Sequence, residues 1–179
     1  MLHPLCVITH LLEADGPMRF LERIRLRCLE TLLSVLRRHG TAWKEQPEHL
    51  RTGLKGEDSA YFYLRHNGYS IVAHRWTASE QSGDLDLIAW KDSQLCFFEV
   101  KTRTARDEFP AEVMVDREKR AILRRLARAY LRHLPGETPP PVRFDILSVY
   151  LLPDGRQEFE HFENAFGWSE AQGGRWGDR

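Results

Sequence analysis

Two apolar segments of strand length, separated by a short polar tetrapeptide, constrain the fold of this chain more than any other feature. The first segment covers residues 83–90, the second covers residues 95–103, and Lys91-Asp92-Ser93-Gln94 lies between them. Short polar loops between strand-like segments are typical of antiparallel β-hairpins. The sequence therefore predicts a hairpin with a four-residue loop.

The register of this hairpin places charged residues on an otherwise apolar surface. If the last residue of the first segment faces the first residue of the second, Asp86 lies opposite Glu99 and Asp84 lies opposite Lys101. Side chains alternate along a strand, so Glu99 and Lys101 share a face. Because opposed like charges destabilise a sheet, the two carboxylates and the ammonium group indicate a bound cation. Surface ion pairs are the simpler alternative, but they contribute only about 0–1 kcal/mol and would not require Asp86 to face Glu99.

Charge is distributed unevenly along the chain. The 179 residues carry 26 basic and 26 acidic side chains, so the net charge is zero and does not by itself indicate a polyanionic partner. Residues 101–134, however, hold ten lysine and arginine residues against five acidic ones. A solvated helix face remains the simpler interpretation of any single arginine in this segment.

Cysteine usage and hydropathy exclude several classes of protein. Cys6, Cys28 and Cys96 are widely separated, odd in number and without CxxC spacing, so they indicate neither a disulfide framework nor a zinc site. No apolar run approaches the length of a membrane span, and the start lacks the basic region and cleavage site of a signal peptide. We therefore expect a cytoplasmic protein that does not associate with a membrane.

Hydrophobic periodicity and turn residues divide the chain into four parts. We expect a poorly ordered leader over residues 1–17, a helical extension and linker over 18–51, a main domain over 52–153, and a tail over 154–179 that is disordered from Gly173. The extension should be helical over 18–39, with one face formed by Phe20, Ile24, Cys28, Thr31, Leu32 and Val35.

Within the main domain, the predicted order is helix, strand, strand, strand, helix, strand. The helices are expected to start near Gly53–Gly56 and at Asp116 and to end at Asn67-Gly68 and near Leu134, and the strands outside the hairpin to cover 69–76 and 142–152. The irregular segment after Arg103, through Pro110, is a candidate mobile loop. Antiparallel strands plus a crossover helix predict an α/β fold with a mixed central sheet flanked by helices.

The first of these helices carries an acidic residue on its apolar face. Helical spacing places Glu57 with Ala60 and Leu64 on the side that meets the sheet. Taken alone, an acidic residue in a first helical turn simply complements the helix dipole. We assign no role to His66 or His74, because a lone histidine is more often solvated or hydrogen-bonded than a metal ligand.

Four segments together match the pattern of a known family. They are Gly53-x-x-Gly56-Glu57-x-x-Ala60, Gly83-Asp84-Leu85-Asp86-Leu87-Ile88-Ala89, Phe98-Glu99-Val100-Lys101-Thr102-Arg103 and Arg143-Phe144-Asp145. In this order they closely resemble the UPF0102 (YraN-like) family, which belongs to the PD-(D/E)XK nuclease superfamily and is similar to archaeal Holliday-junction resolvases. The resemblance covers residues 52–152 and implies a restriction-endonuclease-like α-β-β-β-α-β core.

The resemblance also implies a catalytic site. Its motif residues correspond to Glu57, Asp86, Glu99 and Lys101 in this sequence. It implies that Asp86, Glu99 and the backbone carbonyl of Val100 bind Mg²⁺ or Mn²⁺, with Glu57 as a further ligand. Hard divalent cations prefer such oxygen donors, and they lower the pKa of a bound water and offset charge on a phosphate group.

Nucleic acid is the partner that follows from this reasoning. Basic side chains can contact backbone phosphates, which gives affinity without sequence specificity. The candidates are Arg103, Arg117, Lys119, Arg120 and Arg124, of which Lys119 corresponds to the lysine of the family's following helix. Our leading hypothesis is a homodimeric, metal-dependent endonuclease that cleaves DNA, including branched DNA. A non-catalytic nucleic-acid-binding or interaction module is the alternative, and an RNA-directed nuclease is a third hypothesis.

Overall fold

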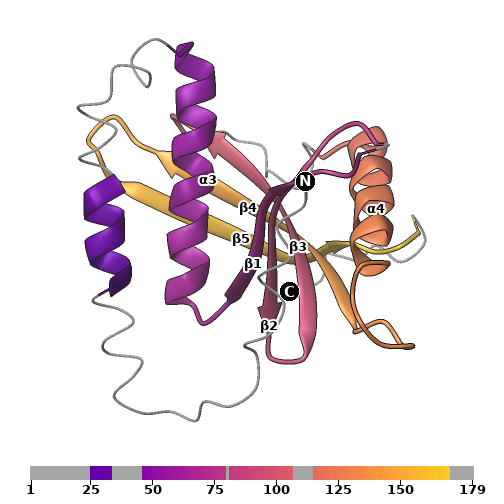
Figure 1. Ribbon diagram of the computed structural model, residues 1–179. Helices are drawn as coiled ribbons and strands as arrows, with labels where there is room; N and C mark the ends of the chain where they lie inside the picture. The colour runs from indigo at the N-terminus through magenta and orange to yellow at the C-terminus, as the bar shows by residue number, and fades with distance from the viewer. Residues whose placement is uncertain (1–24, 34–45, 80, 107–114, 170–179) are drawn as a thin grey trace, which may run out of the picture.

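The structure of the chain is a computed structural model that describes residues 25–33, 46–79, 81–106 and 115–169 (Figure 1). Its named elements are α3 (Glu48–His66), β1 (Ser70–Trp76), β2 (Leu85–Lys91), β3 (Gln94–Arg103), α4 (Arg117–Leu131), β4 (Val142–Leu151) and β5 (Gln157–Phe166). No helix within these described ranges has the length and hydrophobicity that crossing a membrane requires.

The strands form one mixed sheet in the order β1-β2-β3-β4-β5. The β3–β4 pair is parallel, with α4 as the crossover connection, and the other three pairs are antiparallel. Figure 1 shows α3 and α4 on opposite faces of this sheet. The predicted α-β-β-β-α-β core is therefore confirmed, and the predicted tail contributes a fifth strand at the edge of the sheet.

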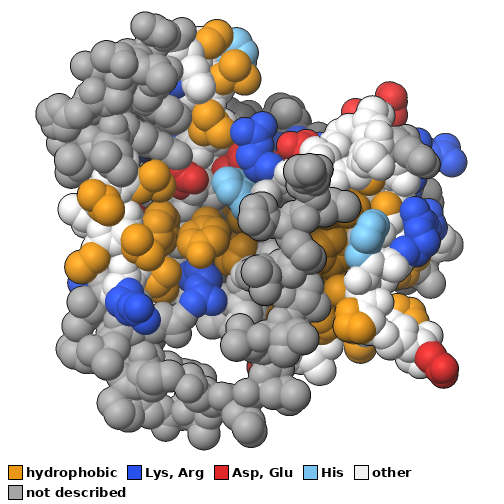
Figure 2. All heavy atoms as spheres, in the orientation of Figure 1, with side chains coloured by type: hydrophobic (Ala, Val, Ile, Leu, Met, Phe, Trp, Pro, Cys, Tyr) orange, Lys and Arg blue, Asp and Glu red, His pale blue; other side chains and the backbone are white. Residues whose placement is uncertain are grey.

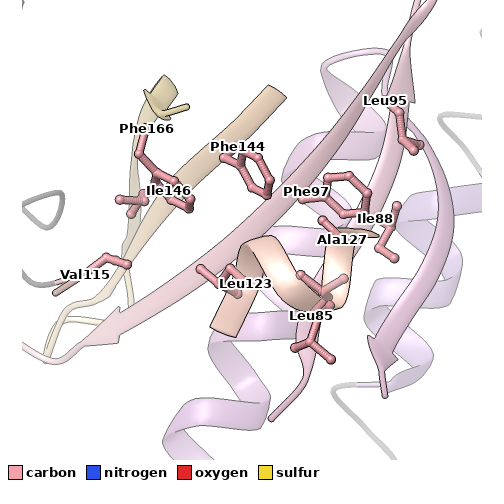
Figure 3. Packing of buried hydrophobic residues seen from close by; sticks show 11 residues of the cluster. Leu85, Ile88, Leu95, Phe97, Val115, Leu123, Ala127, Phe144, Ile146 and Phe166 are labelled. Carbon is pink, nitrogen blue, oxygen red and sulfur yellow. The ribbon is translucent and has the colours of Figure 1, made fainter. Parts of the chain in front are cut away.

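Each helix covers its face of the sheet with a separate hydrophobic core. On the α4 face, Leu123 and Leu126 pack with Phe97 and Phe144 from the strands (Figure 3). On the α3 face, residues such as Ala60, Leu64, Phe98 and Leu147 form the second core. Neighbouring residues Phe97 and Phe98 enter different cores because side chains alternate along β3. On β3, the parity of each position therefore decides which helix the side chain meets.

The predicted hairpin register is confirmed, because Trp90 pairs with Leu95. The loop is shorter than predicted, since Lys91 also pairs with Gln94 and only Asp92 and Ser93 turn the chain. Asp92 takes a left-handed conformation with φ of 53°, which aspartate tolerates better than most residues.

The prediction that α3 starts near Gly53–Gly56 is wrong, because the helix begins at Glu48, directly after Pro47. Glycine normally argues against a helix interior, but Gly56 has a packing reason to lie there. A Cβ on Gly56 would overlap the side chain of Thr102 on β3. The absence of a side chain thus lets α3 lie against the strand that carries the predicted site.

The N-terminal extension is described only over residues 25–33, which are helical as predicted. The predicted apolar face is wrong there, because Leu26 is buried whereas Cys28 is exposed and Leu32 is 54% exposed. The other parts of the predicted helix, the predicted disorder of 1–17 and from Gly173, and most of the predicted mobile loop lie outside the described residues.

Candidate active site

The hairpin brings Asp86 and Glu99 together on the face that α4 covers. Leu87 and Phe98 are the last paired residues of the β2–β3 ladder at this end, and Asp86 and Glu99 are the next residues on the two neighbouring strands. Glu99 is buried at 4% exposure. Asp86 Oδ2 accepts a hydrogen bond of 2.6 Å from the backbone N–H of Val100, which fixes the carboxylate against β3.

The electrostatics of this pair are unfavourable without a compensating cation. The pKa of Asp86 is raised from its ordinary value of 3.8 to about 7, mainly by burial and in second place by the nearby Glu99 carboxylate. The Val100 N–H and the Lys119 ammonium group act in the opposite direction, and Glu57 makes a smaller contribution that raises the pKa. Two carboxylates buried close together resist simultaneous ionisation. The site therefore holds a carboxyl group whose charge is poorly compensated.

Two lysines flank the second carboxylate of the pair. Lys101 Nζ donates to Glu99 Oε1 at 2.9 Å, and Lys119 Nζ from α4 lies 3.1 Å from Glu99 Oε2. Burial lowers the pKa of Lys119, but the carboxylates around it, Glu99 foremost, outweigh this effect and the net pKa is raised. Asp116, the N-cap of α4, accepts a hydrogen bond of 2.8 Å from the Lys119 N–H and anchors the first turn that carries this side chain.

Lys101 does not form the predicted pair with Asp84. Its ammonium group bonds instead to Glu99, two residues earlier on the same face of β3. Asp84 forms an ion pair with Arg75 Nε at 3.9 Å. The β2–β3 pairing ends before Asp84 is reached, because Leu87 and Phe98 are the last paired residues at this end.

Glu57 reaches the same site from α3. Its Oε2 lies 3.1 Å from His74 Nε2 and 3.6 Å from Arg75 Nε, both at the end of β1. The Glu57 side chain is 16% exposed, so it is largely withdrawn from solvent. No pattern in the sequence predicted His74 or Arg75 at this position. The His74–Glu57 contact joins residues 17 positions apart in different elements, and such a contact leaves no local pattern.

These acidic residues line a cavity of about 730 Å³ between the first turns of α3 and the end of β3. A volume of this size is typical of pockets that accept small ligands or part of a larger one. Its walls are formed by Glu48, His49, Thr52, Gly53, Glu57, Asp86, Glu99, Val100, Thr102, Arg103 and Thr104. Sequence reasoning missed Glu48 and His49, because it assigned them to a linker, and Thr52, because it placed this residue before the start of the predicted helix.

The predicted phosphate-binding residues occupy different environments. Arg103 lines the cavity and Lys119 contacts Glu99, whereas Arg117 is exposed on α4. Arg120 Nε donates to the Val115 carbonyl at 2.8 Å.

Arg124 is 7% exposed, and it holds the segment that follows β5. It donates to the Gly167 carbonyl at 2.7 Å, and its guanidinium group lies 5.4 Å from the centre of the Phe166 ring. Arg103 and Lys119 are therefore the two predicted phosphate-binding residues that lie at the carboxylates.

The donor set suits a hard cation but is small. Asp86 and Glu99 offer carboxylate oxygens, the donors that Mg²⁺ and Mn²⁺ prefer, and a cation would relieve the repulsion that raises the pKa of Asp86. Within the described parts of the chain, no three His, Cys, Asp or Glu side chains converge in an arrangement that would hold a metal ion. A metal here would therefore also need backbone, water or substrate oxygens as ligands.

The mixed sheet, its two flanking helices and the acidic residues Asp86 and Glu99 define an α/β protein with a restriction-endonuclease-like core and a charged cavity. The sequence model of the uncharacterised protein family UPF0102 matches residues 56–149, which include every predicted catalytic residue. The chain belongs to the UPF0102 family.

Relatives in distant bacteria support this membership. A UPF0102 protein of Koribacter versatilis is 46% identical over 134 residues, which cover 75% of this chain and 87% of the relative. A UPF0102 protein of Solibacter usitatus is 44% identical over 107 residues, or 60% of this chain and 80% of the relative. One from Symbiobacterium thermophilum is 41% identical over 116 residues, or 65% and 96% of the two chains.

Proposed function

We propose that this protein is a metal-dependent endonuclease that hydrolyses phosphodiester bonds in DNA, including branched DNA. The observation that carries the proposal is the pair of a half-buried Asp86 and a buried Glu99, which lies beside two lysines in the wall of a cavity. A stability role explains this arrangement poorly, because burying two carboxylates next to each other opposes folding.

Asp86, Glu99 and the backbone carbonyl of Val100 are the groups that we assign to Mg²⁺ or Mn²⁺, with Glu57 as a further ligand. When bound, such a cation lowers the pKa of a water molecule and offsets negative charge that develops on a phosphate group. The Val100 N–H orients Asp86 for this task through the hydrogen bond to Oδ2.

Lys101 and Lys119 supply the positive charge that the protein itself brings to the reaction. Their ammonium groups lie 2.9 and 3.1 Å from the Glu99 oxygens, so they are close to any phosphate bound at that carboxylate. Lys101 would orient the attacking water, and Lys119 would stabilise charge on the phosphate oxygens. Glu57 can accept a proton from a water molecule, and His74 holds its carboxylate in place. Arg103, in the cavity wall, would bind the neighbouring phosphate.

One observation favours a second function, that of a nucleic-acid-binding module without catalysis. Both oxygens of Glu99 already face lysine ammonium groups, so this carboxylate is charge-compensated without a metal ion. In such a protein, the lysines would serve only to attract the phosphate backbone.

The test compares the purified full-length chain with Asp86→Asn and Glu99→Gln variants on labelled duplex, flap, four-way-junction and single-stranded DNA, and on RNA. Each reaction contains Mn²⁺, Mg²⁺ or EDTA. Glu137→Gln is the matched control, because Glu137 is exposed in the turn that follows α4. We expect cleavage of DNA that requires a divalent ion, falls at least about 100-fold in both site variants, and is unchanged in the control.

A second readout is independent of cleavage. Mn²⁺ should raise the melting temperature of the wild-type protein, because a ligand that binds only the folded state stabilises it. Cleavage that survives both substitutions would refute the site. Metal-independent DNA binding with no cleavage of any substrate would support the binding module.

A further inference from the structure

Arg75, at the end of β1, has a backbone conformation that is unusual for arginine. Its φ angle is 51°, which lies in the left-handed region. Among the described residues, the other non-glycine positions with positive φ are Asp92 and Asn164. Asp and Asn are the residue types enriched in this region, whereas a long side chain such as arginine is unusual there. Such strain persists only where the surrounding structure imposes it, and it is concentrated at functional sites.

The contacts that Arg75 makes do not account for the free-energy cost of its left-handed backbone conformation. Its Nε lies 3.6 Å from Glu57 Oε2 and 3.9 Å from Asp84 Oδ2, which are too long for hydrogen bonds. The Arg75 side chain is 51% exposed, and ion pairs in such settings contribute little to stability. Glu57, moreover, has a closer partner in His74, at 3.1 Å. The guanidinium group is therefore loosely held between two acidic side chains.

The position of Arg75 links it to the candidate site. Because His74 pairs with Leu87 and Trp76 pairs with Leu85, Arg75 lies across the β1–β2 ladder from Asp86. Figure 2 shows acidic, basic and histidine side chains gathered beside α3 on this face of the molecule. Lys101 and Lys119 approach the carboxylates from β3 and α4, whereas Arg75 approaches from β1. The acidic side chains of the site therefore have basic neighbours on two sides. The lysines lie at Glu99, and Arg75 lies near Glu57 and Asp84.

We propose that Arg75 is a phosphate-binding residue of this site and that it holds the backbone of the bound nucleic acid on the β1 side of the cavity. This inference rests on the proposed function. A guanidinium group binds phosphate through two parallel hydrogen bonds, a geometry that lysine cannot provide. Glu57 and Asp84 keep the group at the site in the free protein, and their long contacts are readily exchanged for a phosphate. The left-handed backbone is the conformation that aims this side chain from an edge strand toward the neighbouring acids.

Replacing Arg75 by asparagine distinguishes the role of the positive charge from the effect of the strained backbone. Arg75→Asn removes the guanidinium group but tolerates positive φ better than arginine does. Binding of a labelled four-way junction and a labelled duplex is measured by fluorescence anisotropy in EDTA, across a series of salt concentrations. We expect affinity to fall about tenfold, the equivalent of one charge-assisted contact, and the slope of log affinity against log salt to shrink by about 0.9. The melting temperature should stay the same or rise by a few °C.

Arg132→Asn is the matched control, because Arg132 is exposed and follows the last residue of α4. It lies roughly 20 Å along the helix from Lys119, given a rise of about 1.5 Å per residue. This variant should change neither the affinity nor the salt slope. Arg75→Lys keeps the charge without the planar group, and we expect it to restore the salt slope but only part of the affinity.

The outcomes separate the two proposals. If the wild-type protein binds DNA and Arg75→Asn binds equally well with the same salt slope, the inference about Arg75 is refuted and the proposed function stands. A lower melting temperature with unchanged binding would show that Arg75 is only a tether between α3 and the β1–β2 loop. If the wild-type protein binds no nucleic acid, the proposed function fails, and the inference fails with it.

Discussion

Two aspartates in this protein, the buried Asp145 and the half-buried Asp86, have opposite surroundings. Asp145, on β4, is 1% exposed and is surrounded by donors. Arg143 Nε and Nη2 donate to it, the Nε2 atom of His161 lies 2.9 Å from Oδ2, and the backbone N–H of Asn164 donates to Oδ1 at 2.9 Å. Within the described part of the chain, Asp86 accepts one hydrogen bond, from Val100, and it lies close to the Glu99 carboxylate.

The difference between these two sites indicates their roles. The Asp145 cluster lies where the β4–β5 register shifts between Phe144 and Ile146, and its hydrogen bonds hold β5 to the sheet at this irregularity. Arg143 provides a positive charge to this carboxylate, and His161 and Asn164 provide further contacts, so side chains and backbone of the chain compensate its charge. At Asp86, burial and the Glu99 carboxylate leave a charge that the chain compensates only in part. An incompletely compensated charge beside a cavity is a feature of binding and catalytic sites.

The largest effect on stability should follow from removing Arg143, the positive charge of the Asp145 cluster. Arg143→Met leaves Asp145 buried without its ion-pair partner, and we expect a loss of about 3–5 kcal/mol in the free energy of unfolding. Urea denaturation followed by circular dichroism measures this loss. Arg156→Met is the control, since Arg156 pairs with Asp154 at 2.6 Å but with side chains 71% and 50% exposed. A loss in the control as large as that of Arg143→Met would contradict the importance of burial.

Replacing Asp86, whose charge is poorly compensated, should instead increase the stability of the folded protein. In the folded protein Asp86 keeps its proton up to about pH 7, whereas in the unfolded chain it loses the proton near its ordinary value of 3.8. The folded state therefore binds more protons between these pH values, and its stability falls as the pH rises. Asp86→Asn removes this dependence, because an amide does not titrate.

We expect metal-free Asp86→Asn to be more stable than the wild type by about 1–3 kcal/mol above pH 7, with the difference disappearing near pH 4. Urea denaturation in EDTA at several pH values measures the difference. Asp145→Asn provides the contrast and should destabilise the protein, because Asp145 accepts charge-assisted hydrogen bonds. A pH-independent effect of Asp86→Asn would show that its carboxyl group titrates normally in the folded state.

The hairpin could be predicted from the sequence because the information that specifies it is local. Strand length, alternation and a short polar loop were sufficient to predict the register that pairs Trp90 with Leu95 and Leu87 with Phe98, next to Asp86 and Glu99. The early start of α3 was not predictable, since Gly56 reads as a helix breaker until the contact with Thr102 is known. The same limit applies to Asp145 and His161, which lie in different strands and meet only through the β4–β5 pairing. Arg75 was missed because no sequence pattern reports a φ angle.

The lysine from α4 gives a smaller test of the uncompensated site. Lys119→Met leaves Glu99 buried with Lys101 as its remaining lysine partner, and we expect a loss of about 1–2 kcal/mol in metal-free stability. If a divalent ion binds at Glu99, Mn²⁺ should raise the melting temperature of this variant more than that of the wild type, because one competing cation is absent. Differential scanning fluorimetry with and without Mn²⁺ measures both effects. Equal Mn²⁺ responses in the two proteins would indicate that Lys119 does not compete with the metal ion.

The smallest predicted effect concerns the hydroxyl group of Tyr69, which links Arg143 to Glu163 by hydrogen bonds. Tyr69 accepts a hydrogen bond of 2.8 Å from Arg143 Nη2 and donates to Glu163 Oε1 at 3.2 Å. Tyr69→Phe keeps the edge-on ring contact with Phe98, so we expect a loss of only about 0.5–1.5 kcal/mol.

A double-mutant cycle determines where this energy resides. If the hydroxyl group acts by orienting Arg143 toward Asp145, Tyr69→Phe should cost almost nothing once Arg143 is replaced by Met. Unfolding free energies of the two single variants and the double variant supply the coupling energy. Additive losses would mean that Tyr69 stabilises the protein independently of the arginine, and that the compensation of Asp145 depends on Arg143, His161 and Asn164 alone.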